Sequence, residues 1–184
     1  MKTAGLFLFG STLSLMVLAA PRLDAQADQD HGGHDSAAPD GLVEVVRNAT
    51  RPFLDVKNIP AGYAPFLGCV SGTQEGAMGV HYVNGELVFD GRLEPDTPEA
   101  VMYEMRNGRL YLLGAEYIVM AEAWDASNAA PPSLLGQAFT FNETPNRFGL
   151  PAFYSLHVWA WRDNPNGTFV DWNPKVSCDG FVAR

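Results

Sequence analysis

The chain has 184 residues, with 12 Lys or Arg against 21 Asp or Glu, so its formal net charge is −9 at pH 7. Its basic residues are not clustered, and an acidic chain of this kind lacks the positive surface that contacts phosphates. Nucleic acids are therefore excluded as expected partners. Hydrophobic residues make up 47% of the chain, which favours a folded globular protein over a disordered one.

The N-terminus carries the pattern of an export signal. Lys2 precedes the apolar run GLFLFGSTLSLMVLAA, and Ala25-Gln26-Ala27 offers small residues for cleavage. The uninterrupted apolar run is shorter than the roughly 18 to 20 residues that span a membrane. We therefore predict a signal peptide over residues 1–27, no membrane span in the mature chain, and export to a periplasm or to the cell exterior. A retained N-terminal anchor is the alternative.

Residues 28–40, DQDHGGHDSAAPD, have no apolar periodicity and are rich in Asp, Gly and His, which is typical of a flexible acidic leader. Within it, His31 and His34 flank two glycines and form a second, weaker candidate for metal binding. A solvated leader without a bound ion is the simpler interpretation. One globular domain over residues 41–184 is expected to follow.

The first predicted element of this domain is helical. Its apolar side chains follow one helical face: Leu42, Val45, Val46, Ala49 and Phe53. Pro52 is expected to kink or end the helix, with a second short helical piece over residues 51–58.

Strand signals begin at Gly79. Asn84-Gly85 and Asn107-Gly108 each separate two alternating runs, which predicts two hairpins with type I′ turns. A third hairpin is predicted from residues 152–162 to residues 168–171, and a long loop before it is expected to hold a short strand near residues 137–141.

Helices followed by antiparallel hairpins predict an α+β fold, with the N-terminal helix packed on a curved antiparallel sheet or partial β-barrel. Cys69 and Cys178 are the only cysteines, and in an exported protein they are predicted to form one disulfide between the start of the domain and its last strand. Closing a loop of about 100 residues contributes about 4.7 kcal/mol in the chain-entropy model.

The second hairpin predicts which side chains point inward. If Asn107-Gly108 is the loop, alternation places Tyr103 and Leu112 on one face with Glu116, and leaves the opposite face solvated. An isolated buried carboxylate costs several kcal/mol unless it is paired, protonated or bound to a metal. Glu116 is therefore either a hydrogen-bonded structural carboxyl or a ligand or catalytic group.

Two histidines could complete a site with Glu116. His157 shares its predicted strand face with Trp159 and Trp161, which favours burial. His81 is less decided, because its strand pattern allows either solvent or a polar cavity. Two imidazoles and one carboxylate are sufficient for a mononuclear centre with open positions that binds copper, zinc or iron.

The leading hypothesis is an exported metal-binding domain with ligands His81, Glu116 and His157. Its expected walls are Tyr82, Trp159 and Trp161. If the domain is an enzyme acting on a small molecule, Glu116 or Asp171 would serve as its base.

The main alternative is a metal-free protein that binds a small apolar or aromatic molecule, and a structural or interaction domain is the third hypothesis. The expected lining of the apolar pocket is Tyr103, Phe153, Trp159 and Trp161. The sequence contains no CxxC, HExxH or GxSxG motif, so no local signature selects a reaction.

Four blocks of the chain resemble an uncharacterised family of exported single-domain proteins of bacteria and fungi. The blocks are AGYAPFLGCVSG, GAMGVHYVNGELVFDG, LLGAEYIVMAEAWD and LHVWAWRDNPNGTFVDWNPKVSC. The resemblance covers nearly all of the chain after the leader. It implies a single exported domain and implies no reaction, cofactor or catalytic residue.

Overall fold

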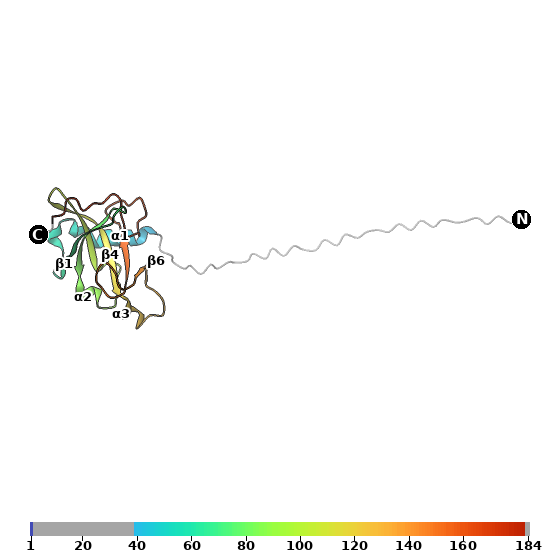
Figure 1. Ribbon diagram of the computed structural model, residues 1–184. Coiled ribbons are helices and arrows are strands. Elements are labelled where there is room, and N and C mark those ends of the chain that lie inside the picture. The colour runs from blue at the N-terminus through green and yellow to red at the C-terminus, as the bar shows by residue number, and fades with distance from the viewer. Residues whose placement is uncertain (2–38, 183–184) are drawn as a thin grey trace. The chain divides into compact units, whose positions relative to one another are not determined.

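A six-stranded antiparallel sheet dominates the computed structural model, which describes Met1 and residues 39–182 (Figure 1). Together with short helices, this sheet confirms the predicted α+β class. The predicted signal peptide (1–27) and all but the last two residues of the predicted leader (28–40) lie outside the described residues, Met1 apart.

The strand order of the main sheet is β1-β2-β3-β4-β8-β7, and β5 and β6 form a separate pair. The helical elements are α1 (Pro39–Thr50), the 3-10 helices η1 (Arg51–Leu54) and η2 (Val56–Asn58), α2 (Gly85–Val88) and α3 (Ala121–Asp125). The strands are β1 (Tyr63–Ser71), β2 (Ala77–Asn84), β3 (Ala100–Arg106), β4 (Arg109–Met120), β5 (Ser133–Leu134), β6 (Gln137–Ala138), β7 (Thr140–Asn142) and β8 (Phe153–Val158). The predicted helical pieces are confirmed, and the region of the one short strand predicted near residues 137–141 holds two, β6 and β7, in different sheets.

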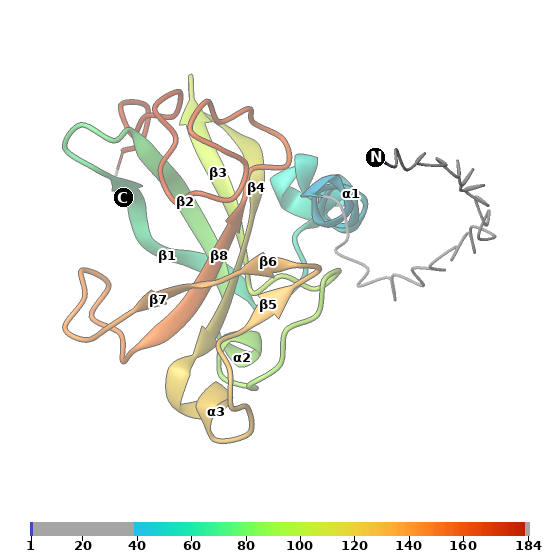
Figure 2. The same ribbon diagram turned by 90° about the vertical axis from the view of Figure 1, so that its right-hand side faces the viewer.

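The predicted hairpin at Asn107-Gly108 is also confirmed. Both residues have positive φ, 50° and 73°, as a type I′ turn requires, and Arg106 pairs with Arg109 as expected. Because β2 and β4 are both antiparallel to β3, their C-terminal ends lie at the same end of the sheet, where α2 and α3 follow them (Figure 2).

The predicted alternation along β4 is wrong beyond Leu112, because the strand contains a bulge. Tyr103 pairs with Leu112, but the residue before Tyr103 pairs with Gly114, so Leu113 is an extra residue in β4. An extra residue exchanges the two faces for the rest of a strand. Glu116 therefore lies on the sheet face opposite Tyr103, and not on the same face.

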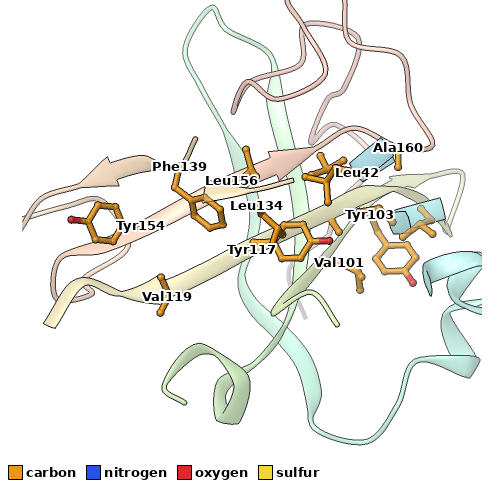
Figure 3. Close-up of a cluster of buried hydrophobic side chains, with 14 of the residues drawn as sticks. Leu42, Val101, Tyr103, Tyr117, Val119, Leu134, Phe139, Tyr154, Leu156 and Ala160 are labelled. Carbon is orange, nitrogen blue, oxygen red and sulfur yellow. The ribbon is translucent and has the colours of Figure 1, made fainter. Parts of the chain in front are cut away.

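Much of the face predicted to be solvated is buried, although Arg106, Arg109 and Tyr111 near the turn are exposed as predicted. Met102, Leu113, Ala115 and Tyr117 are at most 1% exposed, and Glu104 is 4% exposed. The reason is that apolar clusters occupy both faces of the sheet. The largest cluster includes Leu42 and Val46 of α1 together with side chains of β3, β4 and β8 (Figure 3).

Gly114 allows β4 and β8 to approach closely beside this bulge. An ideal Cβ at Gly114 would lie only 2.0 Å from the carbonyl oxygen of Val158. Any larger residue would push the two strands apart, so the glycine fixes the pairing of Glu116 with His157 two residues further on.

The predicted hairpin at Asn84-Gly85 is wrong. Asn84 has φ −96°, not a positive value, and its side chain accepts a hydrogen bond from the backbone N–H of Glu86, which starts α2. The partners of β2 are instead β1 and β3. Strand β1 was not predicted, because its residues 63–71 do not alternate regularly between exposed and buried.

The C-terminal part differs from the predicted third hairpin. Residues 168–171 form no strand, and β8 pairs with β4 and β7 instead. The predicted disulfide between Cys69 and Cys178 is confirmed, with a Cα–Cα distance of 5.7 Å and a sequence separation of 109. It joins β1 to the irregular C-terminal segment, not to a last strand.

Candidate metal centre

Three strands bring His81, Glu116 and His157 to one face of the sheet. Glu116 of β4 pairs directly with His157 of β8 on one side and with Ala100 of β3 on the other. His81 lies on β2, where it pairs with the β3 residue Met102. Paired residues on neighbouring strands point to the same face, and the positions in β3 are two residues apart, so all three polar side chains converge.

The polar atoms of the three side chains lie close together. Nε2 of His81 is 3.3 Å from Oε2 of Glu116, and Nε2 of His157 is 3.7 Å from Oε1 of the same carboxylate. One ligand atom from each residue lies within 4.8 Å of the other two. The two imidazole rings are nearly perpendicular, with centroids 5.8 Å apart.

All three residues are buried, which changes their proton affinities. Burial, together with repulsion from His157, lowers the pKa of His81 from 6.5 to about 3, so His81 is neutral at physiological pH. Burial also raises the pKa of Glu116 above 4.5, although attraction to His157 opposes this shift. A neutral imidazole is the form that donates a lone pair to a metal.

His157 has the opposite behaviour. Burial lowers its pKa, but the attraction of Glu116 and Asp171 outweighs burial, and the pKa lies above 6.5. Oδ1 of Asp171 is 3.2 Å from Nδ1 of His157, close enough for an ion pair, and this contact lowers the pKa of Asp171. Neither ring nitrogen of His157 has a well-aligned hydrogen bond among the described residues.

An under-satisfied buried imidazole needs an explanation. The ring of His157 is 2% exposed, so water does not replace the missing partners freely. A cation between Nε2 of His157, Nε2 of His81 and the carboxylate of Glu116 would satisfy all three groups at once.

The predicted aromatic walls are only partly formed around this cluster. Trp159 lies almost parallel to His157, with ring centroids 6.4 Å apart. Tyr82 and Tyr103 contact each other on the opposite face of the sheet, because Tyr82 follows His81 directly in β2. The predicted pocket lining is therefore divided between the two faces.

Trp161 does not reach the cluster either. Because β8 ends at Val158, the alternation used to predict its face stops there. The indole N–H of Trp161 instead donates a hydrogen bond to the hydroxyl of Thr50 in α1. Of the aromatic residues predicted to bind a ligand, Phe153 is the one that lines the same cavity as His81 and Glu116.

Most of the residues that line this cavity were not predicted from the sequence. Phe66 and Leu67 of β1 and Phe148 and Leu150 of the loop before β8 complete its wall. These residues lack a periodic pattern, and the only local signal is the glycine that follows Leu67. The side of the cluster formed by His81 and Glu116 therefore borders an apolar wall, which is built from segments distant in sequence.

Comparison with known proteins found no matching family model, no matching curated protein and no matching solved structure. None of the helices in residues 39–182 is long and apolar enough to cross a membrane. The buried cluster of His81, Glu116 and His157 could hold a metal ion, and the disulfide fits an oxidising environment.

Proposed function

We propose that this chain is an exported metal-binding protein with a mononuclear site formed by His81, Glu116 and His157. The observation that carries the proposal is the convergence of two imidazoles and one carboxylate, all buried, on one face of the sheet. Buried ionisable groups are costly unless they are paired or coordinate a metal, and here three of them share one location.

The distances support this proposal. Two ligand atoms bound to one ion at about 2.1 Å in tetrahedral geometry lie about 3.4 Å apart. The two distances from Glu116 to the histidine nitrogens, 3.3 and 3.7 Å, bracket that value. One ligand atom from each of the three residues also lies within 4.8 Å of the other two.

The chemistry of the ligands favours a transition metal. Imidazole and carboxylate ligands suit zinc, copper or iron, and three protein ligands leave at least one position open. A metal in this site would polarise a small substrate or activate water or dioxygen. Glu116 as a ligand is not free to act as a base, so Asp171 is the candidate for that role.

Asp171 also has a positioning function in this proposal. Metal-bound histidines usually donate their second ring N–H to a carboxylate, which fixes the tautomer and the ring orientation. The contact between Oδ1 of Asp171 and Nδ1 of His157 supports this arrangement, because it leaves Nε2 of His157 to face Glu116.

The same proposal includes export of the protein and the packing of α1 on the sheet. The pattern of residues 1–27 supports a removed signal peptide, so we infer a periplasmic or extracellular protein. The place of Leu42 and Val46 in the main apolar cluster supports α1 as the cover of one face of a curved sheet. The resemblance to exported bacterial and fungal proteins is consistent with the inference of export.

The alternative of a metal-free pocket for an aromatic molecule has less support. The cavity beside the cluster measures about 40 Å³, and the apolar cavity that adjoins it measures about 200 Å³. Sites for small organic molecules measure roughly 300 to 1,000 Å³. Moreover, Trp161 and Tyr103 do not line it, so an aromatic ligand would find neither the volume nor the predicted walls.

Equilibrium dialysis against zinc, copper and iron(II) tests the proposed function. We expect one equivalent of metal per chain, and loss of binding in both His81→Ala and His157→Ala. Glu104→Gln is the matched control, because Glu104 is also buried but pairs with Arg106 and Ser177. Undiminished metal binding in the two histidine variants would overturn the site.

A further inference from the structure

A second, larger cavity adjoins the space beside the metal centre. The inner cavity has about 40 Å³ and is lined by His81 and Glu116 among apolar side chains such as Phe66 and Phe153. The outer cavity has about 200 Å³, and the two share four lining residues. A molecule in the outer cavity would therefore lie next to the inner cavity.

The outer cavity has no polar side chain in its wall. Val83 of β2, Val88 of α2 and Leu150 line it, and Phe89 stands at its rim with 63% of its surface exposed. An exposed apolar patch beside a polar centre is typical of a ligand-binding groove. Because every side chain in this wall is apolar, the outer cavity favours an uncharged hydrocarbon group.

An irregularity in β1 lies in the wall of the inner cavity. Phe66 pairs with His81, but the next paired residue is Cys69, so Leu67 and Gly68 bulge out of the strand. Leu67 has φ 57°, a conformation that is rare for a leucine, and it is 54% exposed. The disulfide at Cys69 holds the strand directly after this bulge.

The inner cavity is too small for a ring but suits a small polar group. One water-sized group needs about 10 to 15 Å³, so the 40 Å³ beside Glu116 hold about three such groups. A carboxylate has three heavy atoms. A divalent ion bound by two neutral histidines and one carboxylate retains one positive charge, which favours an anionic oxygen ligand.

From these observations we propose that the metal centre binds a small carboxylic acid with an unbranched hydrocarbon chain. The carboxylate occupies the inner cavity on the metal, and the chain lies in the outer cavity between β2, α2 and Leu150. This proposal rests on the proposed function, because the metal supplies the charge that holds the carboxylate.

A series of carboxylates tests this arrangement on the full chain loaded with Co²⁺, whose visible absorption spectrum reports ligand binding. Acetate, butyrate, hexanoate and octanoate are titrated in turn. Each buried methylene should tighten binding about fourfold, so hexanoate should bind about 200-fold more tightly than acetate. The gain should decrease once the outer cavity is filled.

Phe89→Ser tests the position of the chain. It should weaken octanoate binding about fivefold or more and leave acetate binding unchanged, because Phe89 contacts only the outer cavity. Phe141→Ser is the matched control, since Phe141 is also an exposed aromatic, at 52%, and lines neither cavity. It should change neither affinity.

The outcomes separate the two proposals. If the chain does not bind Co²⁺, the proposed function fails and the carboxylate site fails with it. If Co²⁺ binds but affinity does not depend on chain length, only the carboxylate site is overturned. Equal weakening of octanoate binding by Phe89→Ser and Phe141→Ser would likewise refute the assigned cavity.

Discussion

Replacing Glu116 by glutamine should have two opposite effects, on metal binding and on the stability of the metal-free protein. Glutamine has nearly the same shape as glutamate but carries no charge. In the proposed site, Glu116 is the only anionic ligand and lies 3.3 and 3.7 Å from the two histidine nitrogens. The substitution therefore removes charge without creating a cavity.

The metal affinity should fall by about 100-fold or more. Removing a residue that hydrogen-bonds to a metal ligand, without touching the metal, lowers metal affinity about 10- to 100-fold. Glu116 is a proposed direct ligand, so its loss should exceed that range.

The metal-free protein should gain stability at pH 7. Burial raises the pKa of Glu116 in the folded protein above 4.5. The unfolded chain therefore releases this proton at lower pH than the folded protein does, and stability falls as pH rises above 4.5. Glutamine does not titrate, so the variant does not lose stability in this way as the pH rises. Asp171 still pairs with His157 in the variant.

Denaturant unfolding of the metal-free proteins between pH 4 and pH 8 measures this effect, and the gain should vanish near pH 4. Glu99→Gln is the control, because burial raises the pKa of Glu99 to about 8 and its carboxylate accepts a hydrogen bond from the backbone N–H of Ile118 without being one of the proposed ligands. Between pH 4.5 and 7 this raised pKa lowers the free energy of unfolding by about 3 kcal/mol. Glu99→Gln should therefore stabilise the protein and leave metal binding intact.

A different result would refute the reasoning. If Glu116→Gln destabilised the protein by about 3 to 5 kcal/mol and metal were never bound, Glu116 would be a structural carboxylate whose ion pair holds the fold.

Two further predictions concern the geometry around the centre. Gly114→Ala should destabilise the protein by about 3 kcal/mol in denaturant unfolding and weaken metal binding, because the new Cβ would lie 2.0 Å from a backbone oxygen of β8. Gly85→Ala is its control, since nothing lies within 4 Å of a Cβ there, and it should change stability by less than about 0.5 kcal/mol. Asp171→Asn should lower metal affinity about 10- to 100-fold in dialysis, through the lost orientation of His157. Unchanged stability in the first variant, or unchanged affinity in the last, would contradict the geometry described.

The sequence was sufficient to predict those features that depend on local chemistry. Asn107-Gly108 needs two positive φ values, and few residue pairs accept them, so this hairpin was predicted with its register. The same reasoning failed at Asn84-Gly85. There the asparagine side chain accepts a backbone hydrogen bond from Glu86 and starts a helix, and a dipeptide pattern does not distinguish the two conformations.

The candidate ligands were predicted from an argument that was partly wrong. Glu116 was selected because alternation placed it among apolar side chains, yet the bulge at Leu113 places it on the other face. That face is buried as well, so Glu116 is buried in either register. The convergence of the three ligands depends on strand pairing, β2 with β3 and β4 with β8, which no single segment encodes.

The cavity beside the ligands could not be predicted, because it depends on a bulge in a strand that the pattern did not indicate. Residues 63–71 are mostly exposed at the edge of the sheet, so they lack the alternation of a half-buried strand. The positive φ of Leu67 has no sequence signature, since leucine rarely adopts it.

Elemental analysis of the purified full chain tests the central claim most directly. His31→Ala and His34→Ala are introduced first, so that the leader contributes no ion. The account predicts close to one equivalent of zinc, copper or iron per chain, and its loss when His157→Ala is added. Absence of metal even after incubation with each ion, or full retention of metal by the His157→Ala protein, would contradict a centre formed by His81, Glu116 and His157.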